Sequence, residues 1–238
     1  MSATASFGKR LGKQYFSSTG AWPVQLLGSP ALRVMCKAVD GEALIEEKTA
    51  LVATLAAFRA EHGFGRGIAA PQIGVTRRFV AVNLGGSGNS SGGGGDNGSD
   101  EIRSSSVSRE MEKTRVLADP RIVWRSAATM TLWDDCMSLP WVLCKVRRNR
   151  SISVEFENEV GETELWAQLP ASTSELLQHE LDHLDGILIT DRMLECSNVG
   201  SDRDDPMVQT IVSREEYESN RAEFDRQVDS TIVPVPAL

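Results

Sequence analysis

The feature that most constrains this chain is a short segment with two histidines four residues apart. It reads "STSELLQHELDHLDG" over residues 172–186. Residues at i and i+4 lie on one face of an α-helix, so His179 and His183 can direct both imidazoles at one metal ion, with Glu180 close to a water on that metal. Because the chain holds only three histidines, a chance match to this spacing is a poor explanation. The pattern predicts a metal centre on a helix.

The residues around the motif also have helical features. Leu177, Leu181 and Leu184 recur at the spacing of one helical face and are expected to form a buried stripe. Ser172 and Glu175 have the spacing of a capping box, in which each side chain bonds the other residue's main-chain N–H. The sequence therefore predicts a helix that begins with this box and turns its apolar side inward.

Short strands flank the predicted helix along the chain. Residues 151–157, "SISVEFE", alternate apolar and polar side chains, and "TELWAQL" returns after a turn as a partner strand. Upstream, an amphipathic helix is expected over residues 41–63, followed by a buried strand over residues 78–84. This order predicts an α+β domain over residues 23–194, with short antiparallel strands packed around a central HExxH helix.

Residues 85–110 interrupt this domain with a Gly/Ser-rich stretch. It has too few apolar side chains to offset the entropy of ordering it, so we expect a disordered loop. Because strand-like sequence resumes at Val116, the stretch is interpreted as an insertion between two strands. The free energy of closing a loop grows only logarithmically with its length, so such an insertion costs little stability.

Composition excludes several classes of protein. At 238 residues and 25.9 kDa the chain allows one ordinary domain with tails. The net charge of −8 argues against a broad nucleic-acid-binding surface, so no DNA partner is expected. No apolar run approaches the roughly 18–20 residues of a membrane span. The four cysteines form no CxxC pair and suit a reducing compartment: Cys36, Cys136, Cys144 and Cys196.

The two ends differ in charge. Residues 1–22 form a basic, Ser/Thr-rich extension without acids, as in an organelle transit peptide, so we expect a mitochondrion or another organelle of endosymbiotic origin, and otherwise the cytoplasm. Residues 195–238 carry ten acids against four bases and are expected to form a polar tail with one solvated helix. That acidity argues against docking to ribosomal RNA through the C-terminus.

A catalytic metal site needs a third protein ligand and one open position. In the pattern HExxHxxGxxH the third histidine would fall at Ile189, which excludes that arrangement. A downstream glutamate is available at three positions of the polar tail that have little to fix them: Glu195, Glu215 and Glu216. The remaining candidate is Cys136, at the end of a strand-like stretch. A lone cysteine there is more often an inert core thiol. Whether Cys136 is a metal ligand therefore depends on the residues around it.

Three segments together resemble peptide deformylases. "GRGIAAPQIG" (65–74) is similar to the family's GxGxAAxQ motif, "DDCMSLP" (134–140) is similar to EGCxS at Cys136 and Ser138, and "QHELDHLDG" (178–186) matches the third motif throughout. They occur in the family's order. The resemblance covers roughly residues 23–194 and implies the deformylase fold.

The resemblance also implies roles for individual residues. Cys136, His179 and His183 would hold one divalent ion, Fe(II) or Zn(II). Glu180 would act as general base on the attacking water, and the amide of Gln72 and the main-chain N–H of Met137 would stabilise the charge that develops on the formyl oxygen. Main-chain contacts to the peptide would come from the first motif: Gly65, Arg66 and Gly67.

The activity implied is removal of the N-formyl group from formylmethionyl nascent peptides, with release of formate. The partners implied are those peptides and, transiently, an organellar ribosome. Two alternatives remain: a divergent deformylase-like protein that binds metal and peptides with weak or altered activity, and an HExxH metallopeptidase with a downstream glutamate ligand.

The second motif departs from the family in two places. Asp134 replaces a glutamate and is expected to pair with Arg148 as that glutamate would. Asp135 replaces a glycine, which would add negative charge beside the metal, crowd the peptide and strain the backbone if a positive φ is needed there. Leu143 stands where many deformylases have an arginine that meets the peptide. Substrate affinity is therefore the property expected to differ.

Overall fold

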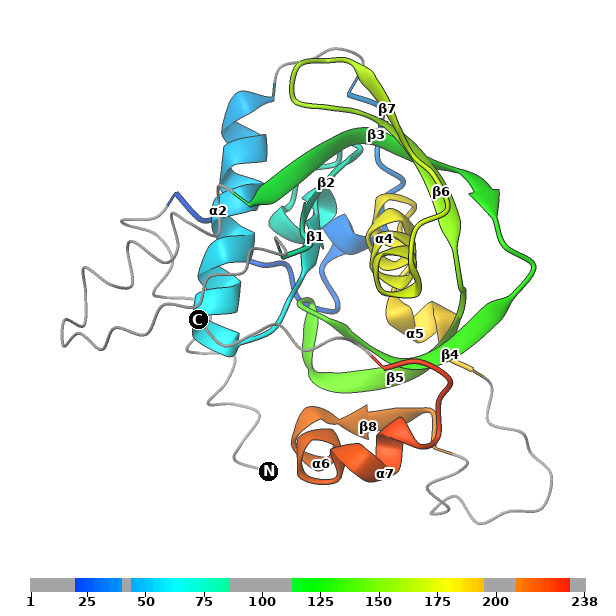
Figure 1. Ribbon diagram of the computed structural model, residues 1–238. Coiled ribbons are helices and arrows are strands. Elements are labelled where there is room, and N and C mark those ends of the chain that lie inside the picture. Colours follow the sequence, from blue (N-terminus) through cyan, green and yellow to red (C-terminus); the bar gives the residue numbers. More distant parts are fainter. Residues whose placement is uncertain (1–19, 40–43, 86–112, 195–208, 232–238) are drawn as a thin grey trace, which may run out of the picture.

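A computed structural model describes residues 20–39, 44–85, 113–194 and 209–231 (Figure 1). The predicted transit peptide and the predicted disordered insertion lie almost wholly outside these ranges, as does Cys196. None of the described helices is long and apolar enough to cross a membrane.

Two antiparallel sheets form the framework. The larger has the strand order β1-β2-β3-β6-β7 and the smaller the order β4-β5-β8. The strands of the larger sheet are β1 Gly67–Ala69, β2 Phe79–Asn83, β3 Thr114–Arg125, β6 Ile152–Glu157 and β7 Thr163–Trp166. Those of the smaller sheet are β4 Thr129–Cys136, β5 Leu139–Asn149 and β8 Ile211–Ser213. Every pairing within them is antiparallel.

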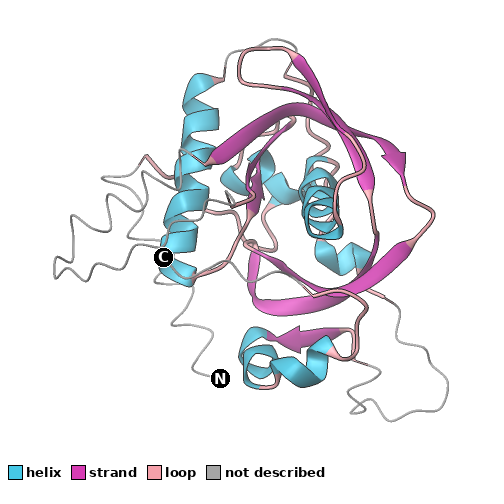
Figure 2. Cartoon of the chain, viewed as in Figure 1, coloured by secondary structure: helices cyan, strands magenta, loops and turns pink. Residues whose placement is uncertain are grey.

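Helices lie inside and outside this framework (Figure 2). The α-helices are α2 Ile45–His62, α4 Ala171–Leu184, α5 Ile189–Arg192, α6 Arg214–Ser219 and α7 Arg221–Asp225, and the 3-10 helices are η1 Pro30–Arg33 and η2 Ala70–Ile73. The strands curve around α4, while α2 covers the outside of β1 and β2. The expected α+β class, with antiparallel strands around a central HExxH helix, is confirmed.

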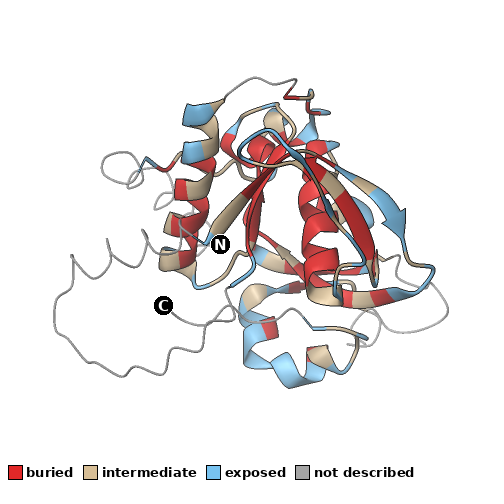
Figure 3. Ribbon diagram, turned by 45° about the horizontal axis from the view of Figure 1, so that its top comes forward, coloured by how far each residue is buried: buried red, intermediate tan, exposed pale blue. Residues whose placement is uncertain are grey.

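The central helix α4 is buried along most of its length (Figure 3). Leu177, Leu181 and Leu184 are all buried in one core cluster, as predicted. The predicted capping box is wrong, because Pro170 occupies the N-cap and no side chain caps the helix. Glu175 instead forms an ion pair with Arg66, so a tertiary partner has replaced the local one.

Helix α2 ends as its sequence predicts. Gly63 has φ of +72° and its N–H donates to the Arg59 carbonyl, which is the usual C-terminal glycine cap. Leu51, Leu55 and Phe58 are buried against β1 and β2. The described helix begins at Ile45, later than the expected residue 41, and residues 40–43 lie outside the described ranges.

Strands β2 and β3 border the predicted insertion. They pair directly, with Asn83 opposite Thr114 at the end where residues 84–113 connect them. These residues therefore join two neighbouring antiparallel strands of one sheet, which is the place of a hairpin turn.

The C-terminal residues 209–231, called here the C-terminal unit, differ from the expected solvated helix. They contain β8, which extends the smaller sheet by pairing with β5, and two short helices in place of one. Tyr217 and Phe224 are buried in a cluster with Trp133, whose Nε1 donates to the Phe224 carbonyl at 3.0 Å. The prediction was wrong because a few large apolar side chains anchor this otherwise charged segment.

Candidate metal centre and catalytic cleft

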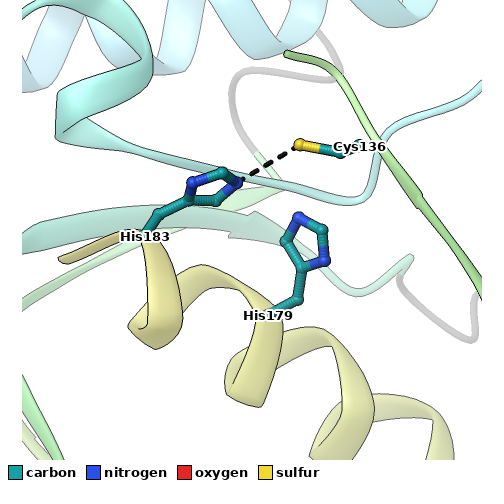
Figure 4. A group of neighbouring side chains, drawn as sticks. All are labelled: Cys136, His179 and His183. Carbon is teal, nitrogen blue, oxygen red and sulfur yellow. Dashed lines mark hydrogen bonds between the residues drawn. The ribbon is translucent and has the colours of Figure 1, made fainter. Parts of the chain in front are cut away.

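Three predicted ligands meet at one point (Figure 4). The side-chain ligand atoms of Cys136, His179 and His183 lie within 4.8 Å of one another, and all three residues are buried. Cys136 ends β4, while both histidines project from α4. A thiolate and two imidazoles in this arrangement suit a tetrahedral divalent ion with one position left open.

The thiol of Cys136 is held by its own hairpin. The β4–β5 register shifts between Asp135 and Cys136, and the chain turns sharply before β5. In that turn the Ser138 N–H points at the Cys136 sulfur at 3.4 Å, and Gln72 Nε2 lies 3.7 Å from the same atom. Both groups are donors, and together they fix the direction in which the Cys136 sulfur points.

The orientation of His179 is set by a carboxylate. Its Nδ1 lies 3.0 Å from Asp134 Oδ2, which leaves Nε2 for a metal. Asp134 also pairs with Arg148 at 3.0 Å, as predicted. Burial alone would raise the pKa of Asp134, but His179 and Arg148 outweigh it and lower that pKa to about 2. Asp134 is therefore a permanent carboxylate that fixes the ring.

His183 differs from its neighbour. Burial, and then the charge of His179, lower the pKa of His183 well below its usual range, so its ring is neutral and able to ligate. Its Nε2 lies 3.3 Å from the Cys136 sulfur. Its Nδ1 is buried and has no hydrogen-bond partner among the described residues.

Glu180 lies against the first motif. It is only 3% exposed, and its Oε2 has no hydrogen-bond partner within the described ranges. A Cβ at Gly67 would come within 2.6 Å of Glu180 Oε1, so glycine is needed at this position to admit the carboxylate. Burial raises the pKa of Glu180 to about 7 against the opposing charge of His179, and the charges of Asp134 and Glu175 act in the same direction as burial.

Gln72 is fixed at both ends of its amide. Its Oε1 accepts the Ala69 N–H at 2.8 Å, and its Nε2 donates to Ser138 Oγ at 3.1 Å. The amide N–H₂ is therefore turned towards the Cys136 hairpin. Met137, the next residue of that hairpin, is buried and packs beside Gly65.

Comparison with known proteins agrees with this geometry. Residues 22–199 match the family described as Polypeptide deformylase. The chain belongs to the peptide deformylase family. It is 30% identical over 169 residues to the peptide deformylase of Pseudothermotoga lettingae, covering 71% of this chain and 80% of that one. It is 28% identical over 172 residues to that of Thermotoga neapolitana, covering 71% and 85%.

Solved deformylases have the same fold. The crystal structure from Thermotoga maritima superposes with a TM-score of 0.56 at 25% identity, covering 74% of this chain and 99% of that one. A second, from Synechococcus elongatus in complex with actinonin, gives 0.58 at 23% identity, covering 75% and 84%. The protein is thus a hydrolase of a metal-dependent deformylase family, with a Cys/His/His group able to hold the metal.

In this deformylase a cleft of about 180 Å³ opens onto the site. One wall carries motif residues, including Gly65, Gly67, Gln72 and Glu180. The opposite wall comes from the C-terminal unit, which sequence reasoning missed: Arg214, Tyr217, Glu218 and Arg221. Nothing in the local sequence identifies these residues as cleft residues, because their position depends on the pairing of β8 with β5.

Asp135 is the attachment point of that second wall. Its carboxylate accepts a hydrogen bond from Arg214 at 2.9 Å. Arg214 also donates to the Pro140 carbonyl at 2.7 Å and stacks 3.6 Å from the centre of the Phe64 ring. Asp135 does not have a positive φ, so the expected backbone strain is wrong, and its charge is neutralised by the arginine.

Arg66 is tied down by its side chain. The guanidinium donates to the Ser172 carbonyl at 2.9 Å and pairs with Glu175 on α4. The Arg66 carbonyl accepts the Asn83 N–H, so it is already used within the protein. Because β1 is the edge strand of its sheet, the main chain around Gly67 has a free side on which an extended peptide can lie.

The alternative third ligands are not brought to the site. Glu215 and Glu216 are exposed on α6, and neither belongs to the metal-ligand group. Glu195 lies outside the described residues.

Proposed function

We propose that this protein removes the N-formyl group from formylmethionine at the start of nascent peptides and releases formate. The observation that carries the proposal is the convergence of Cys136, His179 and His183 on one point, at a cleft that Glu180 and Gln72 also line. Membership of the deformylase family supports it.

The donor set fits Fe(II) or Zn(II). A thiolate and two imidazoles suit both ions. Asp134 orients His179, and two N–H donors surround the thiolate of Cys136. When bound, the divalent ion supplies Lewis acidity for activation of water and of the formyl carbonyl.

Glu180 acts as the general base. Its carboxylate takes a proton from the water that attacks the formyl carbon, and a new C–O bond forms. The formyl C–N bond then breaks, and Glu180 returns the proton to the leaving amine nitrogen. A pKa near 7 suits both proton transfers, because near neutral pH the carboxyl group of Glu180 both takes up and releases a proton readily.

Gln72 and Met137 stabilise the charge that develops on the formyl oxygen. The Gln72 amide is held rigidly by Ala69 and Ser138, so its N–H needs no reorganisation during the reaction. The main-chain N–H of Met137, next to the ligand cysteine, is the second donor.

The peptide lies between the two walls of the cleft. Its main chain runs along the free edge of β1, with contacts to Gly65, Arg66 and Gly67. Its following residues pass the C-terminal unit, where Arg214 closes the cleft over Phe64. A structurally similar deformylase from Acinetobacter baumannii has been solved with Met-Ala-Ser bound, which makes formyl-Met-Ala-Ser a suitable probe.

We further propose that residues 1–22 direct the protein to an organelle, where it meets nascent chains at the ribosome. A fusion of these residues to a fluorescent protein should localise to that organelle, and a diffuse fusion would contradict the proposal.

Formate release from formyl-Met-Ala-Ser tests the activity directly. Protein loaded anaerobically with Fe(II) or Zn(II) is compared with Cys136→Ser and with the matched control Cys36→Ser, a buried thiol elsewhere in the core. We expect the first substitution to abolish formate release and metal retention, and the second to preserve both. Metal bound by the wild type without turnover would favour the divergent, weakly active alternative. Turnover that survives Cys136→Ser would contradict the proposed site.

A further inference from the structure

The ion pair between Arg66 and Glu175 lines the catalytic cleft. Glu175 is buried on α4, and the Arg66 side chain, only 15% exposed, reaches it from the first motif. The proposed reaction uses the main chain of Arg66 but neither of the two charged side chains. Replacing a buried ion pair with apolar side chains is often neutral or stabilising, so the fold alone does not require charges at this place.

The pair lies on the open side of the metal site. The cleft is lined by four residues of α4: Glu175, Leu176, His179 and Glu180. His183, one turn further along the helix, is not among the described residues that line it. Glu175 precedes His179 by four residues, which is about one helical turn and ~6 Å along the axis. The cleft therefore extends from the metal ligands towards the ion pair.

The charges of the pair also act on the proposed base. Burial is the main cause of the raised pKa of Glu180, and the charges of Glu175 and Arg66 contribute to it with opposite signs. Such electrostatic interactions weaken with distance. The ion pair therefore borders the space in which the formyl group reacts.

The side chain of the first residue is the part of the substrate that can reach this pair. In formylmethionine the sulfur is five bonds from the formyl carbon, and an extended path of that length spans about 6 Å. This span matches one turn of α4. With the formyl group beside Glu180, the end of the first side chain can therefore lie against Arg66 and Glu175.

The lining of the cleft is partly apolar and partly polar. Leu176 and Met137 are buried and apolar, and both line the cleft. Arg66 donates to the Ser172 carbonyl at 2.9 Å and to the carboxylate of Glu175. A guanidinium has five N–H groups, so Arg66 has donors left for a ligand beyond these two bonds.

A wall of this kind favours a side chain whose end accepts a hydrogen bond. The thioether sulfur of methionine is a weak acceptor, and its oxidised form, methionine sulfoxide, carries a polar oxygen. Norleucine is a hydrocarbon of nearly the same length and offers no acceptor. A site that hydrogen-bonds a substrate group disfavours the analogue without it, because the buried donors are left unpaired.

We propose that Arg66, held in place by Glu175, determines specificity for the first side chain of the formylated peptide by donating a hydrogen bond to its end. The substrates then include formylmethionine and also formylmethionine whose sulfur is oxidised to the sulfoxide. This assignment rests on the proposed function, because it concerns the same cleft and the same reaction. Glu175 is a positioning residue, which fixes the guanidinium and balances its charge.

Three peptides that differ only at the end of the first side chain test the proposal. Formate release by the metal-loaded wild type is measured with formyl-norleucyl-Ala-Ser, formyl-Met-Ala-Ser and the sulfoxide of formyl-Met-Ala-Ser. We expect kcat/KM for the sulfoxide to equal or exceed that for the norleucine peptide. A purely apolar pocket would disfavour the sulfoxide by about 10–100-fold, because its oxygen would lose water without gaining a partner.

Arg66→Leu combined with Glu175→Leu makes this part of the wall apolar. Both residues are replaced, because burial raises the pKa of Glu175 to about 7 against the opposing charge of Arg66, and either group alone would be buried without its partner. The ratio of kcat/KM for the sulfoxide to that for norleucine should fall at least tenfold. The control, Arg78→Leu with Asp185→Leu, removes an ion pair at the C-terminal end of α4 and outside the cleft, and should change the ratio by no more than about twofold.

The ratio is taken within each variant, so a general loss of activity does not alter it. Melting temperature and metal content confirm that each variant is folded. A wild type that disfavours the sulfoxide tenfold or more against norleucine, or a ratio unchanged in the cleft variant, would overturn the proposal. If the cleft variant does not fold, the wild-type series alone decides. Release of formate from none of the peptides would refute the proposed function as well, whereas release with an apolar preference would refute only the role of Arg66.

Discussion

The two walls of the catalytic cleft are held together differently. The motif wall is a network in which each motif fixes another, since Gln72 bonds Ser138 and Asp134 bonds His179. The C-terminal wall is attached from outside through Arg214, which bonds Asp135. The attachment lies at the position where the second motif departs from the family. Asp135 and Arg214 thus form one interaction. The proposed catalytic residues and the residues of the C-terminal wall come from separate parts of the chain.

The comparison is tested most strongly by Glu180→Gln, which removes the base and keeps the shape of the motif wall. We expect kcat for formate release to fall by about 10²–10⁴ with metal content unchanged. The matched substitution on the C-terminal wall, Glu218→Gln, alters an exposed glutamate that lines the cleft and should leave kcat within about twofold. Equal losses from the two substitutions would abolish the distinction between the walls.

The pH dependence of the wild type tests the same role of Glu180 without a substitution. Glu180 must be ionised to accept a proton, and burial raises its pKa to about 7 in the protein alone. Activity should therefore fall on the acid side of neutrality, and a bound divalent cation, which favours the carboxylate, should move this limb to lower pH. A profile of kcat/KM that stays flat down to pH ~4, the usual range of a glutamate, would argue against Glu180 as the base.

Gln72→Leu should have the next largest effect. Removing one donor to the developing oxyanion costs about 10²–10³ in kcat, with little change in KM because the donor acts on the transition state. Steady-state kinetics with formyl-Met-Ala-Ser measure the split. A change confined to KM would assign Gln72 to substrate binding.

Asp134→Asn tests whether the motif wall is one network. Metal affinity should weaken about 10–100-fold, because His179 loses the carboxylate that orients it. Stability should fall by about 3 kcal/mol at neutral pH, because Arg148 loses one of its buried partners. The folded pKa of about 2 lies below the usual 3.8, so the stabilisation is complete above pH ~4 and disappears as pH falls through about 2. Urea unfolding at both ends of that window checks the sign, and a deficit that grows in acid would contradict it.

The smallest effect is expected at the contact between Asp135 and Arg214, which connects the two walls. Arg214→Ala leaves Asp135 unpaired at the cleft and should raise KM several-fold with kcat nearly unchanged. Asp135→Gly combined with Arg214→Ala should recover part of the loss, with a coupling of about 1 kcal/mol in kcat/KM. Additive effects of the two substitutions would show that Asp135 and Arg214 do not act as a pair.

The motif wall could be predicted because the residues that define it lie close together in the sequence within each motif. The period of Leu177, Leu181 and Leu184 identifies a buried helix, and motif spacing places His179 and His183 on one of its faces. The capping box failed for a different reason. Glu175 could bond either to the main chain at the helix start or to a side chain far away in the sequence. Its observed partner is the distant Arg66, which the neighbouring residues could not predict.

The C-terminal wall could not be predicted, because its information is not local. Strand β8 has three residues, and α6 and α7 have six and five, so no periodicity develops. Their order depends on β5 and on Trp133, some seventy to ninety residues upstream.

The pairing of Asn83 with Thr114 has a practical consequence for protein engineering. The sheet pairs the residues at both ends of the connection, and a two-residue turn would be long enough to join them. Asn83 also donates its N–H to the Arg66 carbonyl. The end of β2 therefore lies beside the first motif, along which the peptide is expected to run. A reporter or a substrate-recruiting domain inserted between residues 85 and 113 would be tethered next to the Asn83–Arg66 contact, and linker length would set its effective concentration at the cleft that Arg66 lines.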